Sequence, residues 1–215
     1  ILAAHPEECS TCPKYGKCEL QVLIQYLGVG PERLRMRVKP FPKNTSNPLF
    51  DHDMTRCVLC GRCARVCQKV RKVNAIDYQK KNGEVYIGAP HEKLLIDADC
   101  RFCGACVEIC PTGALMDKKE LIDLNKNKDT ALVPCRNTCP AGTDIPTYIR
   151  LVNEGKYSEA TAVIREKVPI PKILGHICSH PCESECRRRN VNEPVSIREL
   201  KLFAVEHDEK EIWKK

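Results

Sequence analysis

Aromatic residues and long apolar runs are scarce in this sequence. Aromatic side chains make up 5% of the 215 residues, against 29% for charged side chains, so one large apolar core is not expected. No apolar stretch has the length of a signal-peptide core or of a membrane-spanning helix. We therefore expect neither a secreted disulfide framework nor a membrane span. We expect a reducing, cytoplasmic location.

Catalytic signatures are missing as well. No general acid, nucleophile or oxyanion constellation stands out, and no Gly-x-Gly-x2-Gly loop occurs. We predict no catalytic residue and no flavin or nucleotide site within these residues.

Cysteine, by contrast, is abundant, with sixteen in the chain. The centre of the sequence carries Cys57-x2-Cys60-x2-Cys63-x3-Cys67 and Cys100-x2-Cys103-x2-Cys106-x3-Cys110-Pro111. Three thiolates at this spacing close around one iron–sulfur core, and the fourth is directed at a second core. We therefore predict two [4Fe-4S] clusters with crossed ligation, one held by Cys57, Cys60, Cys63 and Cys110, the other by Cys67, Cys100, Cys103 and Cys106.

A structural zinc site is the main alternative for these motifs. It requires two well-separated Cys-x2-Cys pairs, and a third cysteine three residues further on is one ligand too many. Between the motifs, residues 73–78 and 84–87 are predicted to form strands joined at Asn82-Gly83. The result is a small α+β ferredoxin-like scaffold with a partly inorganic core, so the apo chain is expected to be largely unfolded.

The formal net charge of +7 does not by itself indicate nucleic-acid binding. An oxidised cubane with four thiolates carries about −2, so four clusters would cancel most of this charge. The basic residues at 33–39 alternate with apolar ones, which predicts a half-exposed strand, with docking on an acidic subunit as the alternative. No aromatic residues are interleaved for base stacking, so no nucleic-acid partner is expected.

A histidine precedes the first group of cysteines, in the motif His5-x3-Cys9-x2-Cys12-x5-Cys18. A lone histidine near a chain start is usually a solvated side chain. Here its spacing suits a fourth ligand, and imidazole in place of thiolate would make the core less negative. We predict a third [4Fe-4S] cluster, followed by an apolar helix over residues 20–27 that ends at Gly28.

Together, these motifs resemble the iron–sulfur arm shared by the large iron–sulfur subunit of respiratory complex I, iron-only hydrogenases and NAD-dependent formate dehydrogenases. The resemblance covers residues 1 to about 120 and implies electron transfer rather than a substrate pocket. In that family a plant-type [2Fe-2S] domain precedes the histidine motif. Nothing here matches that domain, so the chain is expected to be a portion of a longer polypeptide.

The second part of the chain is predicted to be all-α. Charged residues over 117–134 predict a solvated linker, with a domain break near Asn127. One helix is expected to start at the cap Asp144 and stop at Gly155, and a second to start at Ser158. A third is expected at Ser196, with Glu199 completing a capping box.

Five cysteines lie in the predicted loops of this part, in Cys135-x3-Cys139 and Cys178-x3-Cys182-x3-Cys186. We predict that four of them hold one further cluster, without deciding which one is spare. A zinc site and free structural thiols are the alternatives. His176 and His180 flank Cys178 and are candidate replacements for a thiolate, although surface or supporting roles are more usual.

Cys139-Pro140-Ala141-Gly142, Pro169-Ile170-Pro171 and the triple-cysteine motif resemble a second family over about 135–208. It comprises the N-terminal helical domain of the glutamate synthase small subunit, dihydropyrimidine dehydrogenase and the NADPH-binding subunit of electron-bifurcating transhydrogenases. That domain normally holds two [4Fe-4S] clusters. This chain lacks a Cys-x2-Cys pair before Cys135, and Lys201 occupies the position of a Glu or Gln ligand.

The sequence thus predicts three domains. These are a His/Cys3 cluster segment over 1–50, a two-cluster ferredoxin-like domain over 51–126 and a helical iron–sulfur domain over 127–215. The resemblances imply the electron-transfer portion of a multisubunit oxidoreductase, with FAD and NAD(P) on a fused or partner lobe and ferredoxin as a candidate partner. A transhydrogenase-like or ferredoxin:NAD(P) bifurcating complex is favoured over a formate dehydrogenase or hydrogenase subunit, and over a non-redox scaffold stapled by clusters.

Overall fold

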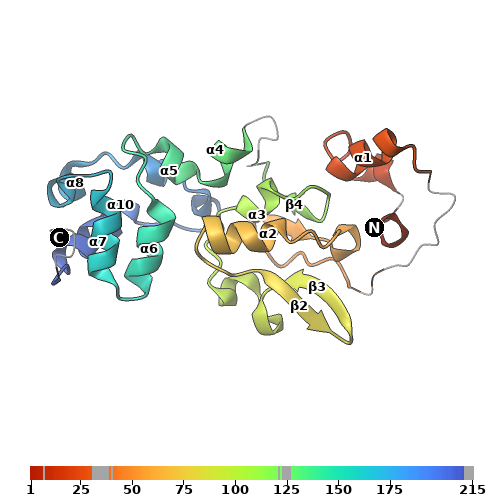
Figure 1. The fold of residues 1–215 in the computed structure, drawn as a ribbon, viewed down its shortest axis with the longest axis horizontal. Helices are drawn as coiled ribbons and strands as arrows, with labels where there is room; N and C mark the ends of the chain where they lie inside the picture. The colour runs from red at the N-terminus through yellow and green to blue at the C-terminus, as the bar shows by residue number, and fades with distance from the viewer. Residues whose placement is uncertain (7, 31–38, 40, 121, 123–126, 211–215) are drawn as a thin grey trace.

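The computed structural model describes residues 1–210 except 7, 31–38, 40, 121 and 123–126. The molecule is elongated, with the N-terminal segment at one end, two small sheets in the middle and a group of helices at the other end (Figure 1). The strand predicted for residues 33–39 lies outside the described residues, apart from Lys39. No helix in the described part of the chain is long and apolar enough to cross a membrane.

The N-terminal segment contains 3₁₀ turns at Leu2–Ala4 and Cys9–Thr11 and the helix α1 at Glu19–Leu27. Gly28 ends α1 in the left-handed conformation, at φ 60°, so the predicted helix and its stop are confirmed. The amide of Glu19 donates to the Pro111 carbonyl (3.0 Å), and Arg62 donates to the Glu19 carboxylate (2.7 Å). The start of α1 is thereby fixed to the middle of the molecule.

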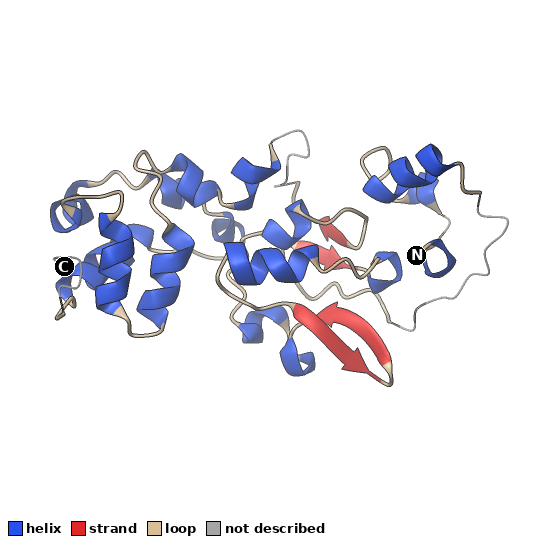
Figure 2. Cartoon of the chain, viewed as in Figure 1, coloured by secondary structure: helices blue, strands red, loops and turns tan. Residues whose placement is uncertain are grey.

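All strands of the described chain lie in the middle part (Figure 2). Its elements are β1 Phe50–His52, α2 Arg62–Arg65, a π-helical turn Val66–Val70, β2 Asp77–Lys81, β3 Glu84–Gly88, α3 Ala105–Glu108 and β4 Leu115–Asp117. Strands β1 and β4 pair antiparallel, as do β2 and β3. Further 3₁₀ turns are Met54–Arg56, Pro90–Glu92 and Leu95–Ala98.

The predicted β-hairpin is confirmed, but its first strand starts later than expected. Asn82 and Gly83 both have positive φ, at 50° and 83°, as a tight hairpin turn requires. Strand β2 begins at Asp77 rather than residue 73, because Asn74 is left-handed (φ 66°) and the amide of Ala75 donates to the Sγ of Cys67 (3.3 Å). The backbone here hydrogen-bonds to a cysteine sulfur instead of to a neighbouring strand.

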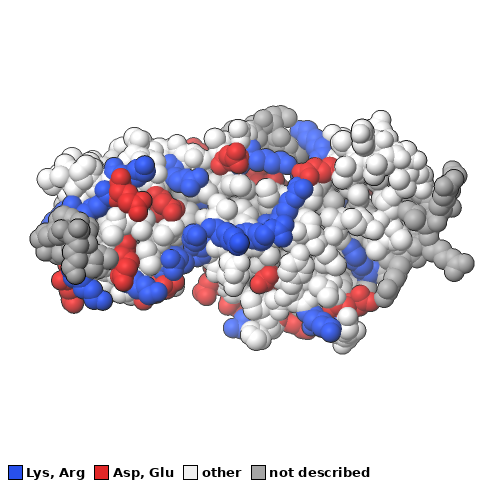
Figure 3. Space-filling view, in the orientation of Figure 1, with Lys and Arg blue, Asp and Glu red and all other residues white. Residues whose placement is uncertain are grey.

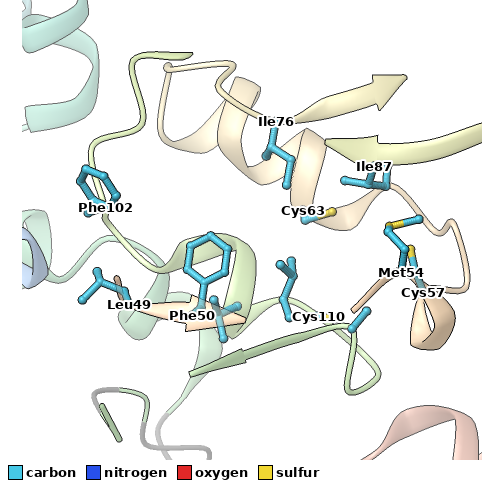
Figure 4. Packing of buried hydrophobic residues seen from close by; sticks show 12 residues of the cluster. Leu49, Phe50, Met54, Cys57, Cys63, Ile76, Ile87, Phe102 and Cys110 are labelled. Carbon is cyan, nitrogen blue, oxygen red and sulfur yellow. The ribbon is translucent and has the colours of Figure 1, made fainter. Parts of the chain in front are cut away.

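The apolar core of the middle part includes cysteines. Figure 4 shows Cys57, Cys63 and Cys110 among the buried side chains of Phe50, Ile76 and Ile87. Other buried members are Leu49, Met54, Phe102, Val107, Ala114 and Leu115. The core is small, as the low aromatic content predicts, and its thiols face inward.

The C-terminal part is helical throughout its described residues. Its helices are α4 Lys128–Leu132, α5 Pro134–Thr138, α6 Ile145–Asn153, α7 Tyr157–Arg165, α8 Pro171–Ile177, α9 Pro181–Ser184 and α10 Ile197–Glu206, with a 3₁₀ turn at Arg187–Asn190. The three predicted helices correspond to α6, α7 and α10. Asp144 caps α6 as expected, accepting from the amide (3.4 Å) and hydroxyl (2.6 Å) of Thr147.

One predicted cap is wrong and one predicted helix start is displaced by a residue. Helix α7 starts at Tyr157, one residue before Ser158, whose buried hydroxyl accepts from the amide of Lys210 (3.2 Å). Ser196 precedes α10 but its side chain makes no capping bond, so the capping box with Glu199 does not form. The Glu183 carboxylate takes that role and accepts from the amide of Arg198 (2.8 Å). At α10 a distant residue has therefore replaced the local partner.

The predicted solvated linker is wrong for its second half. Residues 128–132 form α4, and Val133, only 1% exposed, lies in the helical core. Pro171 starts α8, because proline is tolerated in the first turn of a helix.

The two parts pack against each other. Val70, at the end of the π turn, contacts the helical core, and Val191 contacts the core of the middle part. Arg188 lies over the Phe102 ring, 5.9 Å from its centroid. In Figure 3, Lys and Arg form a band across the middle of the visible face, over α2, while both signs of charge are mixed elsewhere.

Candidate metal centres

The two central motifs have the same backbone path. Leu59 and Phe102, each two residues after the first cysteine of its motif, are left-handed (φ 54° and 51°), and so are Gly61 and Gly104 (φ 69° and 70°). The amide of Leu59 consequently points at the Sγ of Cys57 (3.4 Å), and the amide of Phe102 at the thiol of Cys100. Backbone amides that converge in this way favour an anion, such as a thiolate.

Cys57, Cys60, Cys63 and Cys110 come together around a cavity beneath β1. Burial and the neighbouring charges of Cys110 and Cys57 raise the pKa of Cys63 to about 12. Burial and the charge of Cys110 likewise raise the pKa of Cys57. These thiols would not ionise together without a compensating positive charge, which iron supplies when it binds.

Cys67, Cys100, Cys103 and Cys106 line a second cavity. Burial and the charge of Cys103 raise the pKa of Cys100 to about 12, and the same causes place that of Cys106 well above its usual value. Cys67 comes from the π turn and the other three from the following motif. The structure thus brings together the two crossed sets that the spacing predicts.

The N-terminal motif surrounds a cavity of about 140 Å³ lined by His5, Cys9, Cys12 and Cys18. The Nδ1 of His5 lies 3.0 Å from the carbonyl of Pro6, which places the ring proton on Nδ1. Nε2 is closed off from solvent and has no hydrogen-bond partner among the residues that the structure describes. Burial lowers the pKa of His5, so its Nε2 lone pair is available to a metal. The residues fit an iron–sulfur cluster with one imidazole ligand.

Gly113 closes this cavity and was not singled out from the sequence. A Cβ at this position would lie 2.8 Å from the Sγ of Cys12 and 3.5 Å from Cδ of Arg56. Arg56 in turn hydrogen-bonds to Cys12, which raises the pKa of the arginine despite its burial. The absence of a side chain at Gly113 leaves room for Cys12.

Four of the five C-terminal cysteines are neighbours. Burial and the charges of Cys139, Glu183, Cys135 and Cys178 raise the pKa of Cys182 to about 12. Burial raises the pKa of Cys139, but hydrogen bonds from Thr143 and from the amides of Ala141 and Gly142 bring it below its ordinary value. Cys186 is not among the groups that raise the pKa of Cys182, but it raises that of Cys135 and lines one cavity with Cys135 and Arg71.

Cys178 repeats the backbone arrangement of Cys57 and Cys100. His180, two residues later, is left-handed (φ 45°), and its amide points at the Sγ of Cys178 (3.4 Å). The His180 ring faces the Cys178 carbonyl (3.2 Å) and Glu183 (3.8 Å). His176 is exposed, and the Lys201 ammonium donates to the Leu174 carbonyl (3.4 Å). His180 and Lys201 thus contact carbonyl groups and, for His180, a carboxylate.

Among the described residues, no three His, Cys, Asp or Glu side chains are gathered closely enough for one metal ion. A four-iron cluster places each ligand on a different iron atom, so its thiolates stand further apart than those around a single ion.

Comparison with known families identifies an iron–sulfur protein of the [4Fe-4S] type. Residues 1–33 match the iron–sulfur binding region of NADH-ubiquinone oxidoreductase G, and residues 47–116 the ferredoxin-like domain of NADH-quinone oxidoreductase subunit 3. Residues 128–213 match dihydropyrimidine dehydrogenase domain II, 4Fe-4S cluster. Both resemblances predicted from the motifs are confirmed, and the chain joins domains of these two kinds.

The curated relatives are named as oxidoreductase subunits. The chain is 45% identical over 83 residues to the NADP(+)-dependent formate dehydrogenase subunit beta of Moorella thermoacetica, covering 39% of this chain and 12% of the relative. It is 41% identical over 80 residues to the NADPH-Fe(3+) oxidoreductase subunit beta of Geobacter sulfurreducens, covering 37% and 12%. The chain therefore spans about an eighth of the length of these relatives.

Two further matches cover more of the chain. The NADP-reducing hydrogenase subunit HndD of Solidesulfovibrio fructosivorans is 31% identical over 150 residues, covering 66% of this chain and 24% of the relative. The crystal structure of an NAD+-reducing [NiFe]-hydrogenase in the H2-reduced state is similar with a TM-score of 0.50 and 26% identity, covering 55% of this chain and 50% of that chain.

Sequence reasoning missed the residues that support the cysteines. Besides Gly113, these are Arg71, which hydrogen-bonds to Cys135, and Arg187, which donates to the Cys103 carbonyl (3.3 Å). Their distance along the chain from the cysteines they touch gives no local signal. The left-handed residues had a weak signal, since Gly61 and Gly104 occupy equivalent positions in the two motifs.

Proposed function

We propose that this chain is the electron-transfer portion of a multisubunit, NAD(P)-linked iron–sulfur flavoprotein oxidoreductase. It relays single electrons along [4Fe-4S] clusters between partner subunits and a flavin lobe on the same or another chain. Its architecture is a His/Cys3 segment over 1–50, a two-cluster ferredoxin-like domain over 51–126 and an all-α iron–sulfur domain over 127–215. A cytoplasmic location follows from the reducing conditions that unpaired cluster thiolates need.

The ligands we propose form four sets. They are His5, Cys9, Cys12 and Cys18; Cys57, Cys60, Cys63 and Cys110; Cys67, Cys100, Cys103 and Cys106; and Cys135, Cys139, Cys178 and Cys182. The last set leaves Cys186 as the spare cysteine, because the neighbours of Cys182 are the other three. When bound, each cluster takes up and releases one electron at a time, and the protein supplies the amides and burial that tune its potential.

One observation carries the proposal. Three of the proposed sets each line a cavity, and a fourth cavity, lined by Cys103, Cys135 and Cys186, lies where the ferredoxin-like core meets the helices. The last two cavities adjoin, because Cys103 lines both. A series of this kind suits electron relay between partners.

We infer the link to NAD(P) from the relatives, whose names include NADP- and NADPH-linked enzymes. A transhydrogenase-like or ferredoxin:NAD(P) bifurcating complex is the version we favour. An electron-transfer subunit of a formate dehydrogenase or hydrogenase is the second candidate, because a formate dehydrogenase subunit is 45% identical and a hydrogenase shares the fold.

Anaerobic reconstitution and electron paramagnetic resonance test this function. We expect on the order of sixteen iron atoms per chain, four per cubane, and four reversible one-electron reductions at low potential. Clusters that bind iron but cannot be reduced would leave the non-redox scaffold as the better account. Addition of NADPH with the flavin-bearing partner should reduce the clusters, whereas reduction by formate or hydrogen alone, with its catalytic partner, would favour the second candidate.

A further inference from the structure

We propose that Arg71 is a positioning residue that links the cluster of Cys67, Cys100, Cys103 and Cys106 to the cluster of the helical domain, setting the reduction potentials of both. The proposal rests on the electron-relay function above. It concerns a residue that no cysteine motif includes, at the place where the two parts of the chain meet.

Arg71 belongs to the walls of two cavities at once. One contains Cys67, Cys100, Cys103 and Cys106, and the other lies between Cys103, Cys135 and Cys186. Only Arg71, Arg101 and Cys103 line both. Arg71 directly follows the π turn that continues α2, and α2 lies at the side of the middle part that faces the C-terminal helices (Figure 1). Arg71 therefore lies between the first of these cluster sites and Cys135, a proposed ligand of the helical cluster.

The guanidinium is held inside this junction. Its Nη1 donates to the carbonyl of Leu132 (3.3 Å) in the helical part, and it hydrogen-bonds to the Cys135 thiol. Its Nε is closed off from solvent and, within the described part of the chain, lacks a hydrogen-bond partner. The donor that remains is available to a sulfur of a bound cluster.

The charges that face Arg71 come almost entirely from cysteines. Cys103, Cys135 and Cys186 raise its pKa against the effect of burial. Within the described residues, Glu185 is the carboxylate that lines the same cavity as Arg71. Arg101 lines both cavities with Arg71, and its pKa is lowered by burial and by the charge of Arg71. Two enclosed arginines side by side require a negative partner, and anionic clusters on both sides provide one.

The physical consequence is that one side chain affects the reduction potentials of both clusters. Each one-electron reduction adds a negative charge to a cluster, and a fixed positive charge enclosed beside it favours the reduced form. Because Arg71 faces both sites, it raises both potentials. When an electron passes from one cluster to the other, one is oxidised as the other is reduced, and the total charge facing Arg71 is unchanged. Arg71 itself gains and loses no atom, proton or electron.

The test compares Arg71→Gln, Arg71→Lys and the control Lys69→Gln in the reconstituted chain. Lys69 lies on the same π turn and is exposed, so its removal deletes an equal charge that solvent already screens. Iron content and potentiometric titrations followed by electron paramagnetic resonance are the readouts. We expect Arg71→Gln to keep its iron. The equilibrium constant for reduction of each adjacent cluster should fall at least tenfold, which lowers the reduction potential of a one-electron couple by 59 mV. Arg71→Lys should recover most of the shift, and Lys69→Gln should leave all potentials unchanged.

Other outcomes are equally informative. Unchanged potentials in Arg71→Gln, or a shift at one cluster alone, would overturn the proposal. A further case is that Arg71→Gln loses iron while Arg71→Lys keeps wild-type potentials and iron. The test then uses Arg71→Met, reconstituted with full iron. A shift of the potentials of both clusters in that variant supports the proposal, and unchanged potentials overturn it. Absence of clusters from the wild-type chain would instead contradict the proposed function.

Discussion

Arg187 of the helical part donates to the carboxylate of Glu108 in the middle part at 2.5 Å, and their side chains are only 12% and 4% exposed. The same guanidinium donates to the carbonyl of Cys103. Gly104 allows this approach, since a Cβ there would lie 3.2 Å from the arginine. The ion pair thus joins the two parts of the chain next to a proposed cluster ligand.

Removing one partner of this pair is expected to destabilise the protein strongly. Glu108→Gln or Arg187→Met leaves an enclosed charge without compensation, which costs on the order of 3–5 kcal/mol. The apparent Tm, followed by circular dichroism under argon, should fall by roughly 10 °C. The double variant should lose less than the sum of the two. As a control, Glu92→Gln breaks the Lys81–Glu92 pair, whose side chains are 47% and 52% exposed, and should change Tm little. Additive losses would contradict the coupling.

Stability should fall as the pH drops from about 6.5 towards 4, because of His52. Burial lowers the pKa of His52 to about 4 in the folded chain, against about 6.5 when unfolded. Between these values the unfolded state binds the extra proton, so the contribution is complete above pH 6.5 and is lost on acidification. The total is about 3 kcal/mol.

His52→Gln should therefore flatten the pH dependence of Tm between pH 7 and 4.5 relative to wild type. His176→Gln, which alters an exposed histidine, is the control and should leave the dependence intact. Subtracting the variant curve from that of wild type removes the acid sensitivity of the clusters themselves. Parallel curves for wild type and His52→Gln would show that the buried imidazole is not responsible.

A nitrogen ligand from His5 should be detectable spectroscopically. With Nδ1 bound to the Pro6 carbonyl, only Nε2 is free to bind iron, so the reduced N-terminal cluster should show ¹⁴N hyperfine coupling. His5→Cys should abolish the coupling, keep the iron and lower the potential, because thiolate is more negative than imidazole. A wild-type spectrum without ¹⁴N coupling would remove His5 from the ligand set.

Gly113→Ala should disturb the same cluster and spare the others. The added methyl would lie 2.8 Å from the Sγ of Cys12, so the thiol must move away from its present position. We expect loss of up to about four iron atoms, one cubane's worth, with the remaining signals unchanged. Gly30→Ala adds the same methyl where no atom lies within 4 Å and should keep its full iron content.

The features that the sequence predicted well depend on residues that are close together along the chain. The spacing of the central motifs anticipated which thiols meet, because three cysteines within seven residues can scarcely do otherwise, and Asn82-Gly83 anticipated the hairpin. What it missed depends on distant partners. Glu183 replaced the Ser196 cap, Val133 near the end of the supposed linker is buried in the helical core, and Arg71 and Arg187 reach cysteines more than thirty residues away. Tertiary contacts of this kind leave no pattern in a single sequence.

The choice among the five C-terminal cysteines can be settled by serine substitution. Cys182 has Cys139, Cys135 and Cys178 around it, whereas Cys186 contacts the junction with Arg71. Cys182→Ser, Cys139→Ser and Cys178→Ser should each abolish the signal of the helical cluster and lower the iron content by up to about four atoms. Cys186→Ser should keep both, although removal of its thiol beside Arg71 should alter the potential slightly. If Cys186→Ser loses the cluster while Cys135→Ser keeps it, the two cysteines exchange roles, and the hydrogen bond from Arg71 to Cys135 then acts beside the cluster rather than on one of its ligands.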